Sequence, residues 1–535
     1  MKRQGEQNMF KILVSDPLSE KGLKILEKEK NIKVDVKIKQ PVDVLKKIIK
    51  DYDALIIRSG TKVTADLIAC ADKLKVIGRA GVGLDNVDIA AATKKGIIVM
   101  NTPGGNTIST AEHAMSLMLS LSRNIAPADA SMKKGEWERK RFMGVELYGK
   151  SLGIVGLGRI GSEVAKRALS FGMRVLAYDP FLTPGKASDS EIELVTLNRI
   201  FSEADYITVH TPLTSETKHL ISEKEIDMMK KGVRFINCAR GGIIDENAVL
   251  KGIESGKVGG AAFDVYEKEP PKDNPIIKSD KVIATPHLGA STTEAQDNVA
   301  LEVAQQVVDA LLERGIRNAI NIPYIELKAW KVLRPYMVLA EKMGMMQAQL
   351  AEGPIREVSL EYAGEVAKHD ITAITTAFVK GLLAPAVGEM VNNVNAIAIA
   401  KERNIKVTES KTSQVEEFAH LITATIKAKS KPQSISGALF ANNQPRIVKI
   451  DNYYVDALPE GNMILISNKD VPGIVGQLGT LLGKNKINIA GMTFGREKPG
   501  GKAISLCNVD SKVPDNLIKE LKKSKNIFDA KSISV

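Results

Sequence analysis

Three side chains with complementary acid–base chemistry follow separate apolar runs of the sequence: Arg240, Glu269 and His287. A histidine titrates near neutral pH and can accept the proton of an alcohol. A carboxylate against the imidazole orients and charges it, while an arginine fork can hold a carboxylate and polarise a carbonyl. Alone, such a histidine is usually structural, and a glutamate before two prolines usually lies in a surface loop. Together they indicate oxidation of an alcohol beside a carboxylate, with His287 as base, Glu269 as orienting acid and Arg240 as substrate clamp.

A glycine-rich turn supplies the second half of such a reaction. Gly156, Gly158 and Gly161 follow the apolar run 152–155 and open a helical pattern over 162–171. In this arrangement the first glycine permits a tight turn, the second lets the backbone approach a pyrophosphate, and the third lets helix and strand pack closely. The amino end of the helix offers unpaired N–H groups to the phosphates. The turn therefore predicts a dinucleotide site.

Asp179 indicates which dinucleotide is bound. It follows the next apolar run and lies 18 residues past Gly161 (179 − 161). A carboxylate at this place accepts hydrogen bonds from the ribose hydroxyls and repels a 2′-phosphate. We therefore predict NAD, rather than NADP, as the cofactor.

Apolar runs alternate with helical patterns over residues 9–107 and again from about residue 150, which is typical of parallel α/β sheets. A long helical pattern over 293–314 can return to the first sheet. We therefore predict two doubly wound parallel-sheet domains, with an NAD-binding Rossmann domain inserted in a flavodoxin-like substrate domain, followed by an α+β domain and a βαββαβ unit. The predicted boundaries are 1–107 and 293–323 for the substrate domain, 108–292 for the NAD-binding domain, 324–459 for the α+β domain and 460–535 for the last unit. Within 324–459 we expect helices over 332–350 and 376–401 and strands near 358–362 and 446–450.

The composition limits the class of protein. Hydrophobic residues make up 44%, charged residues 26%, and the formal net charge is +12. The basic residues are scattered and aromatic residues are only 4%, which argues against a nucleic-acid partner, whereas an anionic small substrate fits the charge. The three cysteines are far apart and show no zinc-ligand spacing, and the sequence lacks a membrane-length apolar run or an apolar signal segment. We expect a cytoplasmic protein without a metal or a membrane partner.

At these residues the chain resembles the D-2-hydroxyacid dehydrogenase family, and the resemblance covers essentially the whole chain from about residue 10. It implies that Arg240, Glu269 and His287 are catalytic. Relatives often carry Thr where Val82 stands, so a hydroxyl contact to the cofactor is lost there. The resemblance implies the following cofactor contacts: Val82, Gly156, Gly158, Arg159, Ile160, Gly161, Asp179, Thr211, Cys238, Ala239, Arg240, Asp264, His287, Leu288, Gly289 and Ala290.

Several segments are similar to the branch of this family that acts on 3-phospho-D-glycerate, among them Arg58-Ser-Gly-Thr61 and the runs 78–88, 101–107 and 137–144. The resemblance implies oxidation of 3-phospho-D-glycerate to 3-phosphooxypyruvate, the first step of L-serine biosynthesis. Arginine forks match the phosphate and carboxylate of such a substrate. The implied substrate-binding residues are Arg58, Ser59, Arg79 and Asn106, with Arg139 or Arg141 as further candidates.

The C-terminal part strengthens this resemblance. Residues 324–459 are similar to the intervening domain of the long members, and 460–535 to an ACT domain, a small effector-binding unit. Asn468, Asp470 and Asn488 match the region where relatives bind L-serine. One relative pattern has His at 468 and Asn at 470, so a dimerisation module without a ligand is an equal interpretation. The resemblance also implies a homo-oligomer, either a dimer through the nucleotide domains or a tetramer.

Two other functions stay open. One is a different D-2-hydroxyacid dehydrogenase, such as a reductase of hydroxypyruvate, glyoxylate or 2-oxoglutarate; the hydroxypyruvate and glyoxylate enzymes generally lack the long C-terminal part. Another is a non-catalytic, NAD-sensing regulatory protein that keeps the fold for partner docking. A formate dehydrogenase fits less well, because it would carry Gln in place of Glu269.

Overall fold

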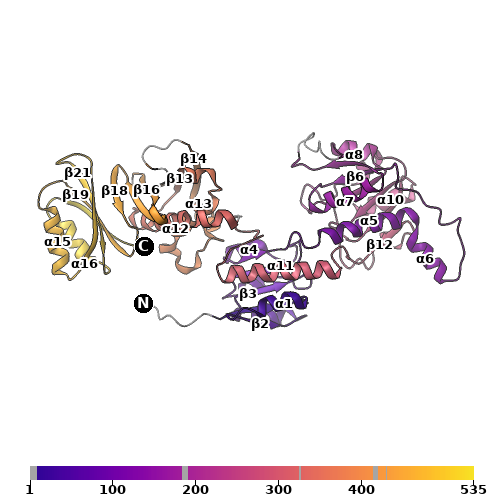
Figure 1. Ribbon diagram of the computed structural model, residues 1–535, viewed down its shortest axis with the longest axis horizontal. Helices are drawn as coiled ribbons and strands as arrows, with labels where there is room; N and C mark the ends of the chain where they lie inside the picture. The colour runs from indigo at the N-terminus through magenta and orange to yellow at the C-terminus, as the bar shows by residue number, and fades with distance from the viewer. Residues whose placement is uncertain (1–8, 183–190, 324–326, 414–417, 419, 429–430) are drawn as a thin grey trace.

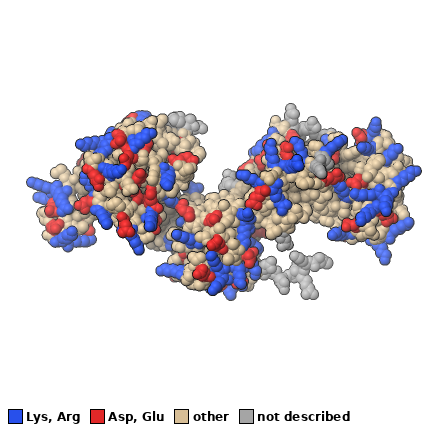
Figure 2. All heavy atoms as spheres, turned by 180° about the vertical axis from the view of Figure 1, so that it is seen from behind, with Lys and Arg blue, Asp and Glu red and all other residues tan. Residues whose placement is uncertain are grey.

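Figure 1 shows the computed structural model as a row of compact units joined end to end. The structure describes residues 9–182, 191–323, 327–413, 418, 420–428 and 431–535. Residues 1–8 and 324–326, which begin the predicted first and third domains, lie outside the described residues. Figure 2 shows basic and acidic side chains interspersed over one face of the molecule. Among the described residues no helix has the length and hydropathy needed to cross a membrane.

The first unit is a parallel sheet in the order β2-β1-β3-β4-β5, which is the flavodoxin-like order. Its strands are β1 (Phe10–Val14), β2 (Ile32–Val36), β3 (Ala54–Ile57), β4 (Val76–Arg79) and β5 (Ile98–Met100). Helices α1 (Glu20–Glu27), α2 (Val42–Ile48), α3 (Ala65–Ala69) and α4 (Ile89–Lys94) connect them. The central strand β3 is buried along its whole length, because helices cover both faces of a parallel sheet.

The second unit is a seven-stranded parallel sheet in the order β12-β11-β10-β9-β6-β7-β8. The strands are β6 (Ser151–Val155), β7 (Arg174–Tyr178), β8 (Ile192–Leu194), β9 (Tyr206–Val209), β10 (Val233–Asn237), β11 (Val258–Phe263) and β12 (Val282–Ala284). The helices are α5 (Thr107–Arg123), α6 (Ile125–Lys133), α7 (Arg159–Ser170), α8 (Leu197–Glu203), α9 (Glu223–Met228) and α10 (Glu246–Glu254). The strand order reverses beside β6, and in such sheets ligands bind outside the carboxyl ends of the strands at this reversal.

Helix α11 (Thr293–Leu311) returns to the first unit, where it packs on α1 and β4 (Figure 1). The packing is close: a Cβ on Gly78 would lie 2.6 Å from Val307. The two chain crossings between the units are joined by a hydrogen bond between Ser109 Oγ and Thr292 Oγ1, 2.6 Å apart. The second unit is therefore an insertion in the first, and the predicted fold class is confirmed.

The third unit has a six-stranded mixed sheet in the order β14-β13-β15-β16-β17-β18. Its strands are β13 (Glu357–Gly364), β14 (Lys406–Thr412), β15 (His420–Lys427), β16 (Gln433–Phe440), β17 (Gln444–Ile450) and β18 (Tyr453–Ala457), and its helices are α12 (Leu327–Leu350), α13 (Thr372–Val387) and α14 (Ala396–Glu402). The prediction of one helix over 376–401 was wrong. Helix α13 ends at Gly388, whose φ of 70° is left-handed backbone that favours glycine.

The last unit is the predicted βαββαβ unit, with an antiparallel sheet in the order β20-β21-β19-β22. It contains β19 (Asn462–Lys469), α15 (Ile474–Lys484), β20 (Ile489–Arg496), β21 (Lys502–Val509), α16 (Asp515–Lys523) and β22 (Ile527–Ser534). Both helices send their apolar side chains, including Leu478 and Leu517, into one core.

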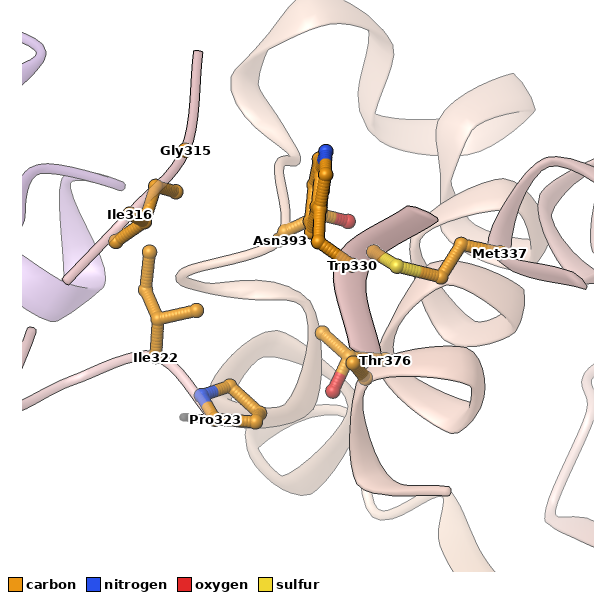
Figure 3. Close-up of a pocket in the computed structure, with 9 residues that line it drawn as sticks. Gly315, Ile316, Ile322, Pro323, Trp330, Met337, Thr376 and Asn393 are labelled. Carbon is orange, nitrogen blue, oxygen red and sulfur yellow. The ribbon is translucent and has the colours of Figure 1, made fainter. Parts of the chain in front are cut away.

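The third unit contacts the first through Asn392, whose Nδ2 donates to the Gly96 carbonyl at 2.8 Å. A small cavity of about 50 Å³ lies at the same junction. Figure 3 shows Ile316 and Ile322 of the connecting segment on one side of it and Trp330 and Met337 of α12 on the other. The cavity is much smaller than the pockets that hold metabolites, so it positions no substrate.

Candidate active site

The predicted base and its predicted partner are in contact. His287 follows β12, Glu269 lies in the loop after β11, and His287 Nδ1 is 2.9 Å from Glu269 Oε2. This hydrogen bond raises the pKa of His287 above its ordinary value, against the effect of burial. Burial is the largest effect on Glu269 and would raise its pKa, but the hydrogen bond and charge of His287, together with the backbone N–H of Tyr266, outweigh it and the pKa is lowered. The opposite shifts are those of a carboxylate that holds a charged imidazole.

Asp264 fixes the turn that carries His287. Its fully buried carboxylate accepts hydrogen bonds from the backbone N–H of Leu288 at 2.7 Å and of Gly289 at 2.8 Å. It also accepts from Thr285 Oγ1 at 2.6 Å, so the chain is held on both sides of His287. The φ of His287 is 56°, a left-handed conformation that is strained for a residue other than glycine. These bonds to Asp264 keep the imidazole in place despite that strain.

Arg240 reaches from the second unit to the first. Its Nε donates to Asp85 Oδ2 at 3.1 Å, and its Nη1 donates to the Ala239 carbonyl at 2.7 Å. A Cβ on Gly83 would lie 1.9 Å from Arg240 Nη2, so the guanidinium fits against the loop only because residue 83 lacks a side chain. Arg240 also acts electrostatically to lower the pKa of His287, less strongly than Glu269 raises it.

Two further arginines join this region. Burial, followed by repulsion from Arg240, lowers the pKa of Arg79 to about 10, and Arg58 adds to the repulsion. The Nε of Arg79 is buried and has no hydrogen-bond partner within the part of the chain that the structure describes. Asp85 and Asp16 act the other way on the pKa of Arg79, so the unpaired buried donor, rather than the net charge, is the feature that fits an anion. Of the other predicted substrate residues, Ser59 is exposed, and Asn106 has a buried Oδ1 without a partner among the described residues.

The glycine turn has the geometry that a pyrophosphate needs. Gly156 has a φ of 96°, and a Cβ there would lie 2.7 Å from the His210 carbonyl oxygen. A Cβ on Gly161 would lie 2.1 Å from the Gly156 oxygen, whereas nothing lies within 4 Å of one on Gly158. Gly158 caps α7, and Arg159 and Ile160 form its first turn. The backbone at Gly158 is thus open to a ligand, as predicted from the sequence.

Asp179 lies beside this turn. Its Oδ2 accepts from the backbone N–H of Leu157 at 3.0 Å, and its Oδ1 accepts from that of Phe181 at 3.0 Å. The carboxylate is therefore fixed where the ribose of a dinucleotide bound on the turn would lie.

The remaining predicted cofactor residues surround the same strand ends. Thr211 has a buried Oγ1 without a partner in the described part of the chain, which fits a hydrogen bond to a ligand. Burial raises the pKa of Cys238, so its thiol stays neutral. The carbonyl of Val82 accepts from Asn101 Nδ2 at 2.5 Å. Ala239 and Ala290 are partly buried. The open turn, the fixed carboxylate and the unpaired hydroxyl fit NAD.

The predicted effector residues do not meet within one chain. Asn468 is 3% exposed and accepts from Ser505 Oγ at 2.9 Å, while Asp470 pairs with Arg496 at 3.4 Å. Asn488 donates to Asp510 Oδ2 at 2.8 Å. Since β20 is antiparallel to β21, and β21 to β19, Asn488 and Asp470 lie at opposite ends of the sheet.

Sequence reasoning missed three polar residues at the site. Asp85 lies within the run 78–88, but its contact with Arg240 joins residues 155 positions apart, and no local sequence pattern predicts such a contact. His113 lies on α5 with its Nε2 3.2 Å from Asp264 Oδ1. Glu246 is buried at the start of α10, where a carboxylate is usually a solvated helix-start residue.

Comparisons with known proteins agree with this geometry. Residues 115–289 match the family model "D-isomer specific 2-hydroxyacid dehydrogenase, NAD binding domain", so this domain binds NAD. Residues 332–451 match "D-3-phosphoglycerate dehydrogenase intervening domain", and residues 462–526 match "ACT domain".

The whole chain has curated relatives. It is 48% identical to the D-3-phosphoglycerate dehydrogenase of Methanocaldococcus jannaschii, over 98% of this chain and 100% of the relative. It is 45% identical to that of Archaeoglobus fulgidus, over 97% of this chain and 99% of the relative. The first two units resemble the structure of D-lactate dehydrogenase from Aquifex aeolicus complexed with NAD and lactic acid, with a TM-score of 0.52 and 29% identity, over 59% of this chain and 100% of that one. The chain therefore belongs to the D-3-phosphoglycerate dehydrogenase family, within the D-2-hydroxyacid dehydrogenases.

Proposed function

We propose that the chain oxidises 3-phospho-D-glycerate at C2 to 3-phosphooxypyruvate with reduction of NAD, the first step of L-serine biosynthesis. The observation that carries this proposal is the His287–Glu269 pair, together with Arg79 and Arg240, whose guanidinium groups lie against the loop that contains Gly81 and Gly83. A base of this kind suits an alcohol, and arginine donors suit a substrate that carries both a carboxylate and a phosphate. The relatives that match this chain along its whole length are named for the same substrate.

Four side chains have separate roles in the proposed oxidation. Since Nδ1 of His287 faces Glu269, its Nε2 is the atom that accepts the proton of the C2 hydroxyl. Glu269 stabilises the imidazolium that forms, and Asp264 holds the turn that aims it. Arg240 binds the substrate carboxylate and the carbonyl that develops at C2. When bound, NAD supplies the acceptor for the C2 hydride.

The substrate phosphate is held by Arg58 and Arg79. The unpaired Nε of Arg79 donates to it, and the negative charge of the phosphate offsets the burial and the repulsion from Arg240 that lower the pKa of this arginine. Ser59 and Asn106 complete this site. NAD is held by the turn at Gly156, Gly158 and Gly161, by Asp179 at the ribose, and by the remaining cofactor positions: Val82, Arg159, Ile160, Thr211, Cys238, Ala239, Asp264, Leu288, Gly289 and Ala290.

The association state and the regulation are part of the same proposal. The α6 region exposes the large apolar side chains of Ile125, Met132, Trp137 and Met143, and their exposure favours a homodimer through the nucleotide domains, with a tetramer as the larger assembly. The ACT unit takes a small effector, L-serine, at Asn468, Asp470 and Asn488, or acts as a dimerisation module without a ligand. The proposed domain boundaries are 1–107 with 293–323, 108–292, 324–459 and 460–535. The site of action is the cytoplasm, where buried thiols such as Cys238 and Cys507 stay reduced.

A substrate panel tests the function. NADH formation is followed with NAD and 3-phospho-D-glycerate, D-glycerate or D-lactate, and NADH consumption with hydroxypyruvate, glyoxylate or 2-oxoglutarate. We expect the highest kcat/KM for the phosphorylated substrate, and a loss of that preference in Arg79→Gln. Equal or better use of an unphosphorylated hydroxyacid would overturn the assignment, and no turnover at all, with NADH still bound, would favour the non-catalytic NAD sensor.

A further inference from the structure

Glu246 is a buried carboxylate that the chemistry above does not use. It lies in the first turn of α10 and is only 7% exposed, although glutamate side chains are almost never buried unless they are paired. Burial raises its pKa, and two hydrogen bonds act against that effect. Burial of a carboxylate destabilises a protein unless hydrogen bonds replace the lost water, so the hydrogen-bond partners of Glu246 indicate its role.

Both partners of Glu246 belong to the loop that carries Glu269. Its Oε1 accepts from the backbone N–H of Glu267 at 2.8 Å, and its Oε2 accepts from Asn274 Nδ2. The two ends of the segment 267–274 are thus tied to one carboxylate. Glu269 lies between these ends, where its Oε1 accepts from the Tyr266 backbone N–H at 3.2 Å.

The same loop packs against the residue that follows Arg240. A Cβ on Gly241 would lie 1.9 Å from the Tyr266 carbonyl carbon, so the two backbones touch. A shift of the loop would therefore disturb the carboxylate that charges His287 and the strand end that carries Arg240 together.

We infer that Glu246 is a positioning residue for the reaction, acting through the loop 267–274 to hold Glu269 against His287. This inference rests on the proposed function. The groups that act on the charge of His287 are Glu269, Asp264 and Arg240, and those beside Glu246 are Glu267 and Asp245. Of the groups that act on the charge of His287, Glu269 is the one that lies in the loop, whereas Glu267 pairs with His219.

The exchange of donor and acceptor between Glu246 and Asn274 gives a sharp test. Glu246→Gln leaves an amide facing the Asn274 amide, and Asn274→Asp leaves two carboxylates facing each other. Asn274→Asp keeps the Oδ1 that accepts from Ile276 N at 3.1 Å, so the cap of the following turn survives. In the double variant, the new amide donates to the new carboxylate, and its carbonyl still accepts from Glu267. Glu254→Gln, on the exposed end of α10, is the matched control.

Two readouts are compared, the pH profile of kcat/KM for oxidation and the titration of the His287 ring by NMR, which His287→Ala assigns among the six histidines. Each single variant should lower kcat/KM roughly tenfold, since a small misplacement of a catalytic group has effects of this size or larger. In each, the pKa of His287 should fall, because a displaced Glu269 raises it less. The double variant should recover both, and the control should match the wild type.

The inference is overturned if both single variants have the melting temperature and the His287 pKa of the wild type. It is also overturned if the kcat/KM and the His287 pKa of the double variant are no closer to the wild-type values than those of the worse single variant. The ring titration needs no turnover. A wild type that is inactive on 3-phospho-D-glycerate would therefore overturn the proposed function, while the NMR comparison still decides the role of Glu246.

Discussion

The candidate active site and the ACT unit contain similar polar residues but hold them differently. Around His287, Glu269 and Asp264 the polar groups bind one another within a single chain, across loops brought together by one sheet. In the ACT unit, Asn488 and Asp470 are separated by the length of the sheet. The groups of the first site are thus already assembled, whereas the residues proposed for an effector in the second do not meet within one chain.

The difference has a physical origin. In a parallel sheet every strand ends at the same edge, so residues after successive strands meet. In the ACT unit β19 and β20 also run the same way, but Asp470 follows β19 whereas Asn488 precedes β20, so these two residues lie at opposite edges of the sheet. Substitutions in the first site should therefore have large effects on turnover, and substitutions in the second should have small ones.

The largest effect is expected for His287→Ala. Removal of the base should lower kcat by roughly two to four orders of magnitude, which is the usual contribution of general base catalysis. Binding of NADH, measured by fluorescence titration, should stay within about threefold, because the glycine turn is untouched. Loss of turnover and NADH binding together would indicate unfolding, and unchanged turnover would remove His287 from the mechanism.

The second-largest effect is expected for Arg79→Gln. The loss of a charged donor to the substrate anion should raise KM for 3-phospho-D-glycerate by roughly 10- to 100-fold, as expected for hydrogen bonds to charged groups. Steady-state kinetics with D-glycerate, which lacks the phosphate, serves as the control and should change little. A fall in kcat with an unchanged KM would contradict the assignment of Arg79 to binding.

Glu269→Gln tests the active site through the pH dependence of kcat/KM. Glu269 raises the pKa of His287, so in the wild type the neutral base appears, and kcat/KM for oxidation rises, only as pH increases through that raised value. Without the carboxylate, burial lowers the pKa, and this rise should move to lower pH. The plateau of kcat should fall by roughly 10- to 100-fold, since the imidazolium is no longer stabilised. A rise that stays at the wild-type pH would show that Glu269 does not charge the base.

Asn488→Ala should have the smallest effect. Its partner Asp510 is close to solvent, and surface substitutions usually change stability by less than about 0.5 kcal/mol. We therefore expect kcat and KM within about twofold of the wild type when no effector is present, measured on protein with unchanged subunit association. A large loss of basal turnover would mean that this end of the ACT unit communicates with the active site even without a ligand.

Secondary structure was predicted best from the sequence where the pattern is local. The run 152–155 with the glycines after it defines a strand, a turn and a helix without reference to any distant residue. Strand β15 was missed although buried and partly exposed residues alternate along His420–Lys427, which is the pattern of a half-buried strand. The helix over 376–401 was extended too far, since its apolar pattern continues beyond Gly388.

In the site, His287 and Glu269 could be predicted because both follow strand ends of one parallel sheet. The contacts of Arg240 with Asp85, and of Glu246 with Asn274, could not, because the sequence does not state which loops become neighbours.

The hydrogen bond between Ser109 and Thr292 has a mechanical consequence. Two passages of the chain join the nucleotide and substrate domains, and this bond holds them side by side. The pair of Arg240 with Asp85 links the same two domains at a second, separate point. The relative placement of the two domains, on which the contact of Arg240 with the substrate domain depends, is therefore supported at two places.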